Sequence, residues 1–143
     1  MSRSLPPRPH PSTRPLTGPA DALSVIVAAA SSPPRPETIC LLVDRAHCGI
    51  ACVVVIGAAP IDEIAQTMLL LADAEPSVAA VVLASVRPGP KHQPQPNDHF
   101  VFDDLRTTFD DAGLDLLDWF VLDGRRAASM AELTDSQSRW RSP

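Results

Sequence analysis

Apolar residues in this chain gather in short continuous runs that alternate with segments of helical period. The runs at 38–43 and 50–56 are rich in β-branched residues and flank a turn that contains Gly49, which predicts a β-hairpin. Runs of the same character at 78–84 and 114–122 predict two further strands, the second of them the last. Because each run is apolar at consecutive positions, we expect the sheet to be covered on both faces.

Two helices are predicted between these strands. Pro60 opens the first, with Asp62 and Glu63 in the first turn, where the helix dipole favours negative charge. Its buried stripe, read from helical spacing, is Ile61, Ile64, Ala65, Met68, Leu71 and Ala72. The second helix begins at Asp98 and ends at Gly113. Its apolar face is expected to be Phe102, Leu105, Phe109 and Ala112.

The resulting order, β-β-α-β-α-β, predicts one α/β domain in which a mixed sheet packs between helices. Residues 20–30 are compatible with either a short helix or a strand. Nine of the sixteen prolines fall within residues 1–36, and the Pro- and Arg-rich composition of residues 1–19 predicts a disordered tail. The domain is therefore expected to span 20–133, followed by a flexible C-terminal tail at 134–143.

The charge of the chain is unevenly distributed. The net charge is −5, yet the only charged residues among the first twenty are Arg3, Arg8 and Arg14. Such an arm could touch nucleic acid or a membrane surface, but we favour a solubilising tail. With no tyrosine, two tryptophans and an acidic body, the chain offers no extensive platform for nucleic-acid bases. No segment reaches the ~20 apolar residues that cross a bilayer, so no membrane association is expected.

Three cysteines, an odd number, favour reduced thiols in a cytoplasmic protein over a disulfide framework. Cys40 and Cys52 lie within apolar runs and are expected in the core. A zinc site formed with Cys48 and His47 is disfavoured, because the spacing lacks the close pairs of structural zinc sites. Residues 22–30 superficially copy a secretory signal, but their apolar core is short and the basic stretch before them is broken by prolines.

The proline-rich segment 85–98, SVRPGPKHQPQPND, carries a spacing pattern that continues to Leu133. The segment begins with Ser85-Val86-Arg87-Pro88. Ten residues separate Arg87 from Asp98, and Gln95 is one of these ten. Gly113, the run Leu116-Leu117-Asp118-Trp119 and Ser129 follow in order. In this frame the chain resembles the C-terminal domain of the RadC family, a bacterial branch of the JAMM (MPN) metalloprotease fold, which is cytidine-deaminase-like. The family has His-x-His-Pro, Ser, Asp and Leu-Leu-Asp-His at these positions.

The resemblance implies a JAB/MPN domain whose zinc-binding residues are replaced. The family site uses two imidazoles and one carboxylate, with a glutamate that activates the fourth ligand, water. Here Ser85 and Arg87 stand at the histidine positions, and Val53 or Val54 falls near the glutamate. A guanidinium has no free lone pair and valine cannot act as a base. Only Asp98 survives, so we expect no catalytic residue, no bound zinc and no enzymatic activity.

Several functions stay open from the sequence. The first is a metal-free binding or scaffold module that pairs with a protein partner or forms a homo-oligomer, as the resemblance suggests. The second is a JAMM-type, metal-dependent hydrolase with rearranged ligands, for which His92, Asp98 and His99 are the candidates. The third is a weak nucleic-acid binder that uses the basic N-terminal arm.

The Arg87 and Asp98 side chains and the two tryptophans each have more than one interpretation. If the loop keeps the family geometry, Arg87 can pair with Asp98 in place of the metal. Alternatively, Arg87 points into solvent and Asp98 caps its helix. Trp119 is expected in or beside the core, and Trp140 is either a docking contact or without a role.

Overall fold

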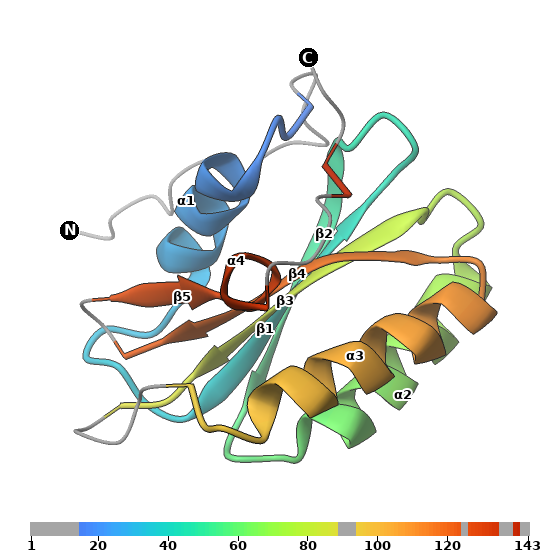
Figure 1. Ribbon diagram of the computed structural model, residues 1–143. Coiled ribbons are helices and arrows are strands. Elements are labelled where there is room, and N and C mark those ends of the chain that lie inside the picture. Colours follow the sequence, from blue (N-terminus) through green and yellow to red (C-terminus); the bar gives the residue numbers. More distant parts are fainter. Residues whose placement is uncertain (1–14, 89–93, 124–125, 135–138, 141–143) are drawn as a thin grey trace, which may run out of the picture.

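The computed structural model describes residues 15–88, 94–123, 126–134 and 139–140. In this part of the chain, helices cover both faces of one five-stranded sheet (Figure 1). The strands are β1 (Glu37–Val43), β2 (Gly49–Ile56), β3 (Ala80–Val86), β4 (Asp115–Leu122) and β5 (Ala127–Ser129). The helices are α1 (Pro19–Ala29), α2 (Ile61–Ala74), α3 (Asp98–Asp111) and α4 (Met130–Leu133).

The strand order is β2-β1-β3-β4-β5, and only the β3–β4 pair is parallel. The hairpin predicted from the two N-terminal apolar runs is confirmed, with Cys40 opposite Val53. The parallel pair follows from α3, which carries the chain from the end of β3 back to the start of β4. The prediction of a mixed α/β architecture is therefore confirmed, and residues 20–29 belong to helix α1.

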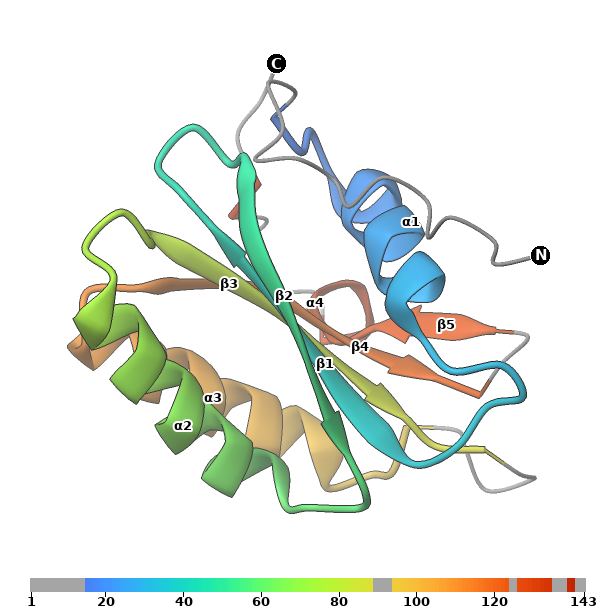
Figure 2. The same ribbon diagram turned by 180° about the vertical axis from the view of Figure 1, so that it is seen from behind.

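Two apolar clusters hold the layers together. One lies between the sheet and the pair α2 and α3, and α4 contributes to it; its largest fully buried side chains are Met68, Phe102, Phe109 and Trp119. The other lies on the opposite face, where α1 sets Ala22 and Ile26 against the sheet. Figures 1 and 2 show α1 alone on this side, and we call its cluster the α1 core.

The ends of α2 and α3 follow their sequence signals. Pro60 is the N-cap residue of α2, and Asp62 and Glu63 occupy its first turn. Gly113, just beyond α3, has a φ of 78°, the left-handed conformation that a glycine adopts without steric cost. Two residues expected in the buried stripes, Leu71 and Ala112, are exposed. Ala112 is the C-cap residue and lies just beyond the last residue of α3.

Two further predictions about the sheet are wrong. The chain does not end its sheet at 122, because β5 and α4 follow, and these segments of three and four residues are too short to give a periodic pattern. Nor are all strands covered on both faces. β2 is an edge strand, and Cys52, expected in the core by its apolar context, is exposed, as is Ile56 at the end of the strand.

Parts of both predicted tails pack on the domain. Leu16 donates its backbone N–H to the carbonyl of His47 at 2.8 Å and contacts the α1 core. Trp140 contacts the same cluster, and its ring meets the edge of His47 at 6.1 Å between centroids. The packed chain thus begins before residue 20 and includes residues beyond 133. The rest of the predicted tails, 1–14, 135–138 and 141–143, lies outside the described residues, as does the loop segment 89–93.

Among the described residues, no helix has the length and apolar character needed to cross a membrane.

Candidate functional site

The predicted site residues Ser85, Arg87 and Asp98 meet where β3 ends and α3 begins. Ser85 lies on the side of β3 that faces α2 and α3, next to Val121 of the parallel strand β4. Arg87 follows directly after β3, and its backbone N–H donates to the carbonyl of Leu122 at 2.7 Å. This bond extends the β3–β4 ladder by one residue and fixes the direction of the arginine side chain.

Arg87 forms a two-pronged ion pair with Asp98. Its Nη1 lies 2.7 Å from Oδ2 of Asp98, and its Nη2 lies 3.2 Å from Oδ1. The Asp98 side chain is 7% exposed and that of Arg87 is 30% exposed. Two parallel N–H···O bonds to a carboxylate are the geometry in which arginine binds most strongly. The pairing predicted as one alternative from the sequence is confirmed.

The other alternative, that Asp98 caps its helix, is wrong. Asn97 is the N-cap residue of α3, and its side chain makes no capping bond. The Asp98 carboxylate instead accepts the backbone N–H of Gln95 at 2.6 Å, upstream of the helix. Gln95, the residue at the family's serine position, therefore contributes its backbone to the site. The carboxylate of Asp98, at the start of α3, therefore binds both Gln95 upstream of the helix and Arg87 after β3.

Trp119 contacts the side chains of both Ser85 and Arg87. Its indole Nε1–H donates to Oγ of Ser85 at 2.9 Å, although the two residues lie 34 positions apart. The guanidinium carbon of Arg87 lies 5.5 Å from the centre of the indole ring, within cation–π range. Trp119 is fully buried, which confirms its expected place in the core.

Val53 is not brought to this site. It pairs with Cys40, which lies opposite Leu83, one pleat away from Ser85. The residue of β2 level with Ser85 is Val55, across Thr38 of β1. Spacing along the sequence cannot place an edge strand to better than one pleat, since a shift of two residues keeps the same face.

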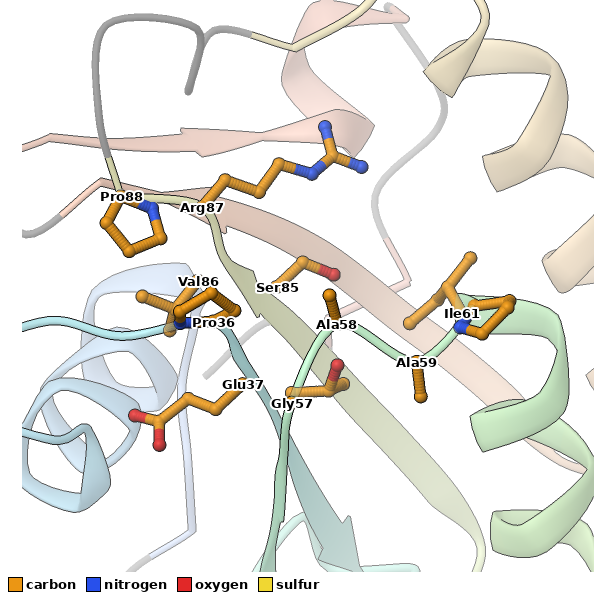
Figure 3. Close-up of a pocket in the computed structure, with 12 residues that line it drawn as sticks. Pro36, Glu37, Gly57, Ala58, Ala59, Ile61, Ser85, Val86, Arg87 and Pro88 are labelled. Carbon is orange, nitrogen blue, oxygen red and sulfur yellow. The ribbon is translucent and has the colours of Figure 1, made fainter.

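A cavity of about 420 Å³ opens beside Ser85 and Arg87 (Figure 3). Its walls are the ends of β1 and β3 and the loop from β2 to α2, with Pro36, Thr38, Ala58 and Ile61 among them. Figure 3 shows the side chains of Arg87 and Glu37 pointing in opposite directions. Glu37 belongs to the far side, where its carboxylate accepts the N–H and hydroxyl of Ser31 at 2.7 and 2.8 Å. Besides Arg87 and Glu37, the polar side chains of the lining are those of Thr38 and Ser85.

The groups around the cavity do not form an activated nucleophile. Ser85 accepts the indole N–H, and within the described part of the chain no histidine or carboxylate accepts a hydrogen bond from its hydroxyl. A serine needs such a base to attack a substrate. In this arrangement the Ser85 hydroxyl is a hydrogen-bonding group of the cavity wall.

The alternative metal ligands are not assembled either. Asp98 is engaged by Arg87, and Nδ1 of His99 bonds the carbonyl of Pro96 at 2.7 Å. His92 lies outside the described residues. Among the residues that are described, no three His, Cys, Asp or Glu side chains come together. Cys40 is buried, which raises the pKa of its thiol to about 12, so at neutral pH it is the protonated thiol rather than the thiolate that metals bind.

A buried polar network adjoins the site, and the sequence revealed only part of it. Asp118 accepts the hydroxyl of Ser129 at 2.5 Å, the N–H of Trp119 at 2.7 Å and the N–H of Ala131 at 3.0 Å. Burial raises the pKa of the Asp118 carboxyl, while these hydrogen bonds and the charge of Arg106 oppose the rise. Ser129 also caps α4. The carboxylate therefore anchors β5 and α4 to the strand that carries Trp119.

Arg106 was missed, although a signal for it existed. It lies in the same stripe of α3 as Phe102, Leu105 and Phe109, at helical spacing, and is buried with them. Its guanidinium carbon lies 4.6 Å from the centre of the Phe102 ring, and Nη2 donates to the carbonyl of Leu117 at 3.4 Å. A charged residue within an apolar stripe indicates a buried partner, here the neighbourhood of Asp118.

The residues at the family's ligand positions do not fit a catalytic zinc ion. A guanidinium paired with the one carboxylate takes the place of a neutral imidazole, and a hydroxyl that accepts an indole N–H takes the place of the other. No family model matches this chain, and no curated protein was found to be similar to it in sequence.

Proposed function

We propose that the protein is a catalytically inactive RadC-like JAB/MPN domain that acts as a metal-free binding or scaffold module. The observation that carries the proposal is the Arg87–Asp98 ion pair, which joins two of the three positions that hold zinc in the family it resembles. A permanent positive charge bound to the remaining carboxylate satisfies that carboxylate without a metal. Trp119 holds the third position, Ser85, through its indole N–H.

The cavity beside the ion pair is the proposed place of contact with a partner. Its volume of about 420 Å³ is within the range of small ligand sites and accommodates a few side chains of a protein segment. Two charged residues line the cavity, and each is already engaged: Arg87 pairs with Asp98, and the carboxylate of Glu37 accepts the hydroxyl of Ser31. This favours a neutral polar segment over a highly charged one. The family resemblance supports a protein partner, and the reduced cysteines support a cytoplasmic location.

Metal analysis tests the proposal against the hydrolase alternative. The untagged full-length chain is purified without chelators, and zinc is measured by mass spectrometry together with peptidase activity in the presence of added zinc. We expect well below one-tenth zinc per chain and no zinc-dependent hydrolysis. Near-stoichiometric zinc would overturn the metal-free assignment and favour a site built from other ligands.

A further inference from the structure

The outer edge of β2 is open. β2 ends the strand order, so β1 covers only one of its two sides. The backbone N–H and C=O groups on the other side have no strand partner within the described part of the chain. Natural proteins guard such edges with charged residues or proline, because an unprotected edge pairs with another strand. The strand Gly49–Ile56, GIACVVVI, contains neither.

The face of β2 that points toward α1 is also apolar and uncovered. Cys52 and Val54 lie opposite Leu41 and Ile39 of β1, which belong to the α1 core. Val54 is nevertheless 39% exposed and Ile56 is 61% exposed. A strand added at the β2 edge would extend this apolar row and bring its own apolar side chains beside it.

The charges at the two ends of β2 indicate which strand fits. Arg45 is exposed in the turn before β2, and Asp62 and Glu63 are exposed in the first turn of α2, just after it. Within the described residues, none of the three takes part in an ion pair. An antiparallel copy of β2 places Arg45 of one chain near Asp62 and Glu63 of the other at both ends. A parallel copy would place like charges together.

We propose that β2 pairs with β2 of a second copy of this chain, antiparallel and about a two-fold axis, to form a continuous ten-stranded sheet. Side chains directly opposite each other in an antiparallel pair share one face of the sheet. Under two-fold symmetry one residue of β2 must then lie opposite its own copy. If the two strands overlap over their full length, that residue is Cys52 or Val53. The proposal concerns the β2 edge and does not depend on the Arg87 site.

Matched lysine substitutions test the interface on the full-length chain. Val54→Lys places a charge one or two residues from the centre of the proposed interface, and Leu70→Lys places the same charge on the outer side of α2, where Leu70 is 73% exposed. Light scattering after size exclusion, at about 100 µM, should give twice the 15.3 kDa chain mass for the wild type and for Leu70→Lys. Val54→Lys should give the monomer mass. A monomeric wild type, or a dimeric Val54→Lys, would overturn the proposal.

Charge exchange tests the antiparallel geometry without touching β2 itself. Arg45→Glu should raise the dimer dissociation constant about tenfold through repulsion from Asp62 and Glu63. Adding Asp62→Lys and Glu63→Lys to that variant should restore most of the affinity. If Arg45→Glu leaves the dissociation constant unchanged, or the triple variant binds no better than the single one, the two strands do not pair in this orientation.

Discussion

Arg87, just after β3, and Asp98, the first residue of α3, hold each other through two N–O contacts of 2.7 and 3.2 Å, and ten residues separate them in the sequence. The pair links the end of β3 to the start of α3. Gln95 adds its backbone N–H to the same carboxylate. The loop is thereby fixed at both ends by one acidic group, and the indole of Trp119 lies beneath the arginine.

Removing the charge of Asp98 should destabilise the protein. Asp98→Asn keeps one acceptor oxygen but cannot form the charged, two-pronged pair with Arg87. In a double-mutant cycle with Arg87→Met, we expect a coupling free energy of about 1–2 kcal/mol, reduced by the partial exposure of Arg87. Urea unfolding measures it. Asp104→Asn, on the exposed side of the same helix, is the matched control and should change the stability by less than about 0.5 kcal/mol.

The indole N–H of Trp119 needs the hydroxyl of Ser85. In Ser85→Ala the buried donor loses its acceptor, which should cost about 1–3 kcal/mol of unfolding free energy. In a Trp140→Phe background, the emission of Trp119 reports the loss directly. Unchanged stability together with unchanged emission would show that this hydrogen bond does not hold the site.

Asp118 should make the stability fall as the pH rises. Burial raises the pKa of its carboxyl in the folded state above the ordinary 3.8, so the folded protein binds the proton more tightly than the unfolded chain. The stability advantage of the wild type over Asp118→Asn should therefore shrink as the pH increases from 3.8 through the raised folded value, and then level off. Urea unfolding of both proteins from pH 4 to pH 8 measures this. An advantage that grows over that range would contradict the sign.

The pair of Arg139 and Asp110 should show the opposite dependence. The hydrogen bonds from Arg139, at 2.5 and 3.0 Å, lower the pKa of Asp110 below 3.8 in the folded state. Its contribution is present above 3.8 and is lost as the pH falls through the lowered value. Because Asp110 is 45% exposed, Asp110→Asn should cost less than about 1 kcal/mol at neutral pH and still less at high salt. Asp111→Asn, its exposed neighbour, should show neither effect.

The sequence predicted the elements whose periodic pattern is long, and the structure shows why the others were missed. The 14-residue helices α2 and α3 and the strands β1, β3 and β4 each bury enough side chains to leave a pattern, and β2 was found from its apolar, β-branched composition although none of its residues is fully buried. β5 and α4 are ordered by the buried carboxylate of Asp118, a contact across eleven to thirteen positions that no local pattern records. The exposure of Cys52 depends on β2 lying at the edge, which is decided by strand order.

The sequence predicted those parts of the candidate site that depend on local spacing and missed those that depend on contacts between strands. Fixed spacing along the loop and helix brought Ser85, Arg87 and Asp98 together as expected, because all three lie on β3 and its direct continuation into α3. The prediction that placed Val53 near the site was wrong, because the position of Val53 depends on the register between β2 and β1. The hydrogen bond from Trp119 to Ser85 could not be derived either, since it joins two strands through side chains whose directions follow from the packed core.

The most direct test of the proposed JAMM-like frame, in which Arg87 and Asp98 stand at zinc-binding positions, is zinc titration of the double variant Ser85→His/Arg87→His by calorimetry. Releasing Asp98 and supplying two imidazoles should create a three-residue site, so the double variant should bind one zinc ion per chain while the wild type binds none. Adding Asp98→Asn should weaken that binding at least about tenfold. A double variant that is folded by circular dichroism yet binds no zinc, or a wild type that binds zinc equally well, would contradict the account.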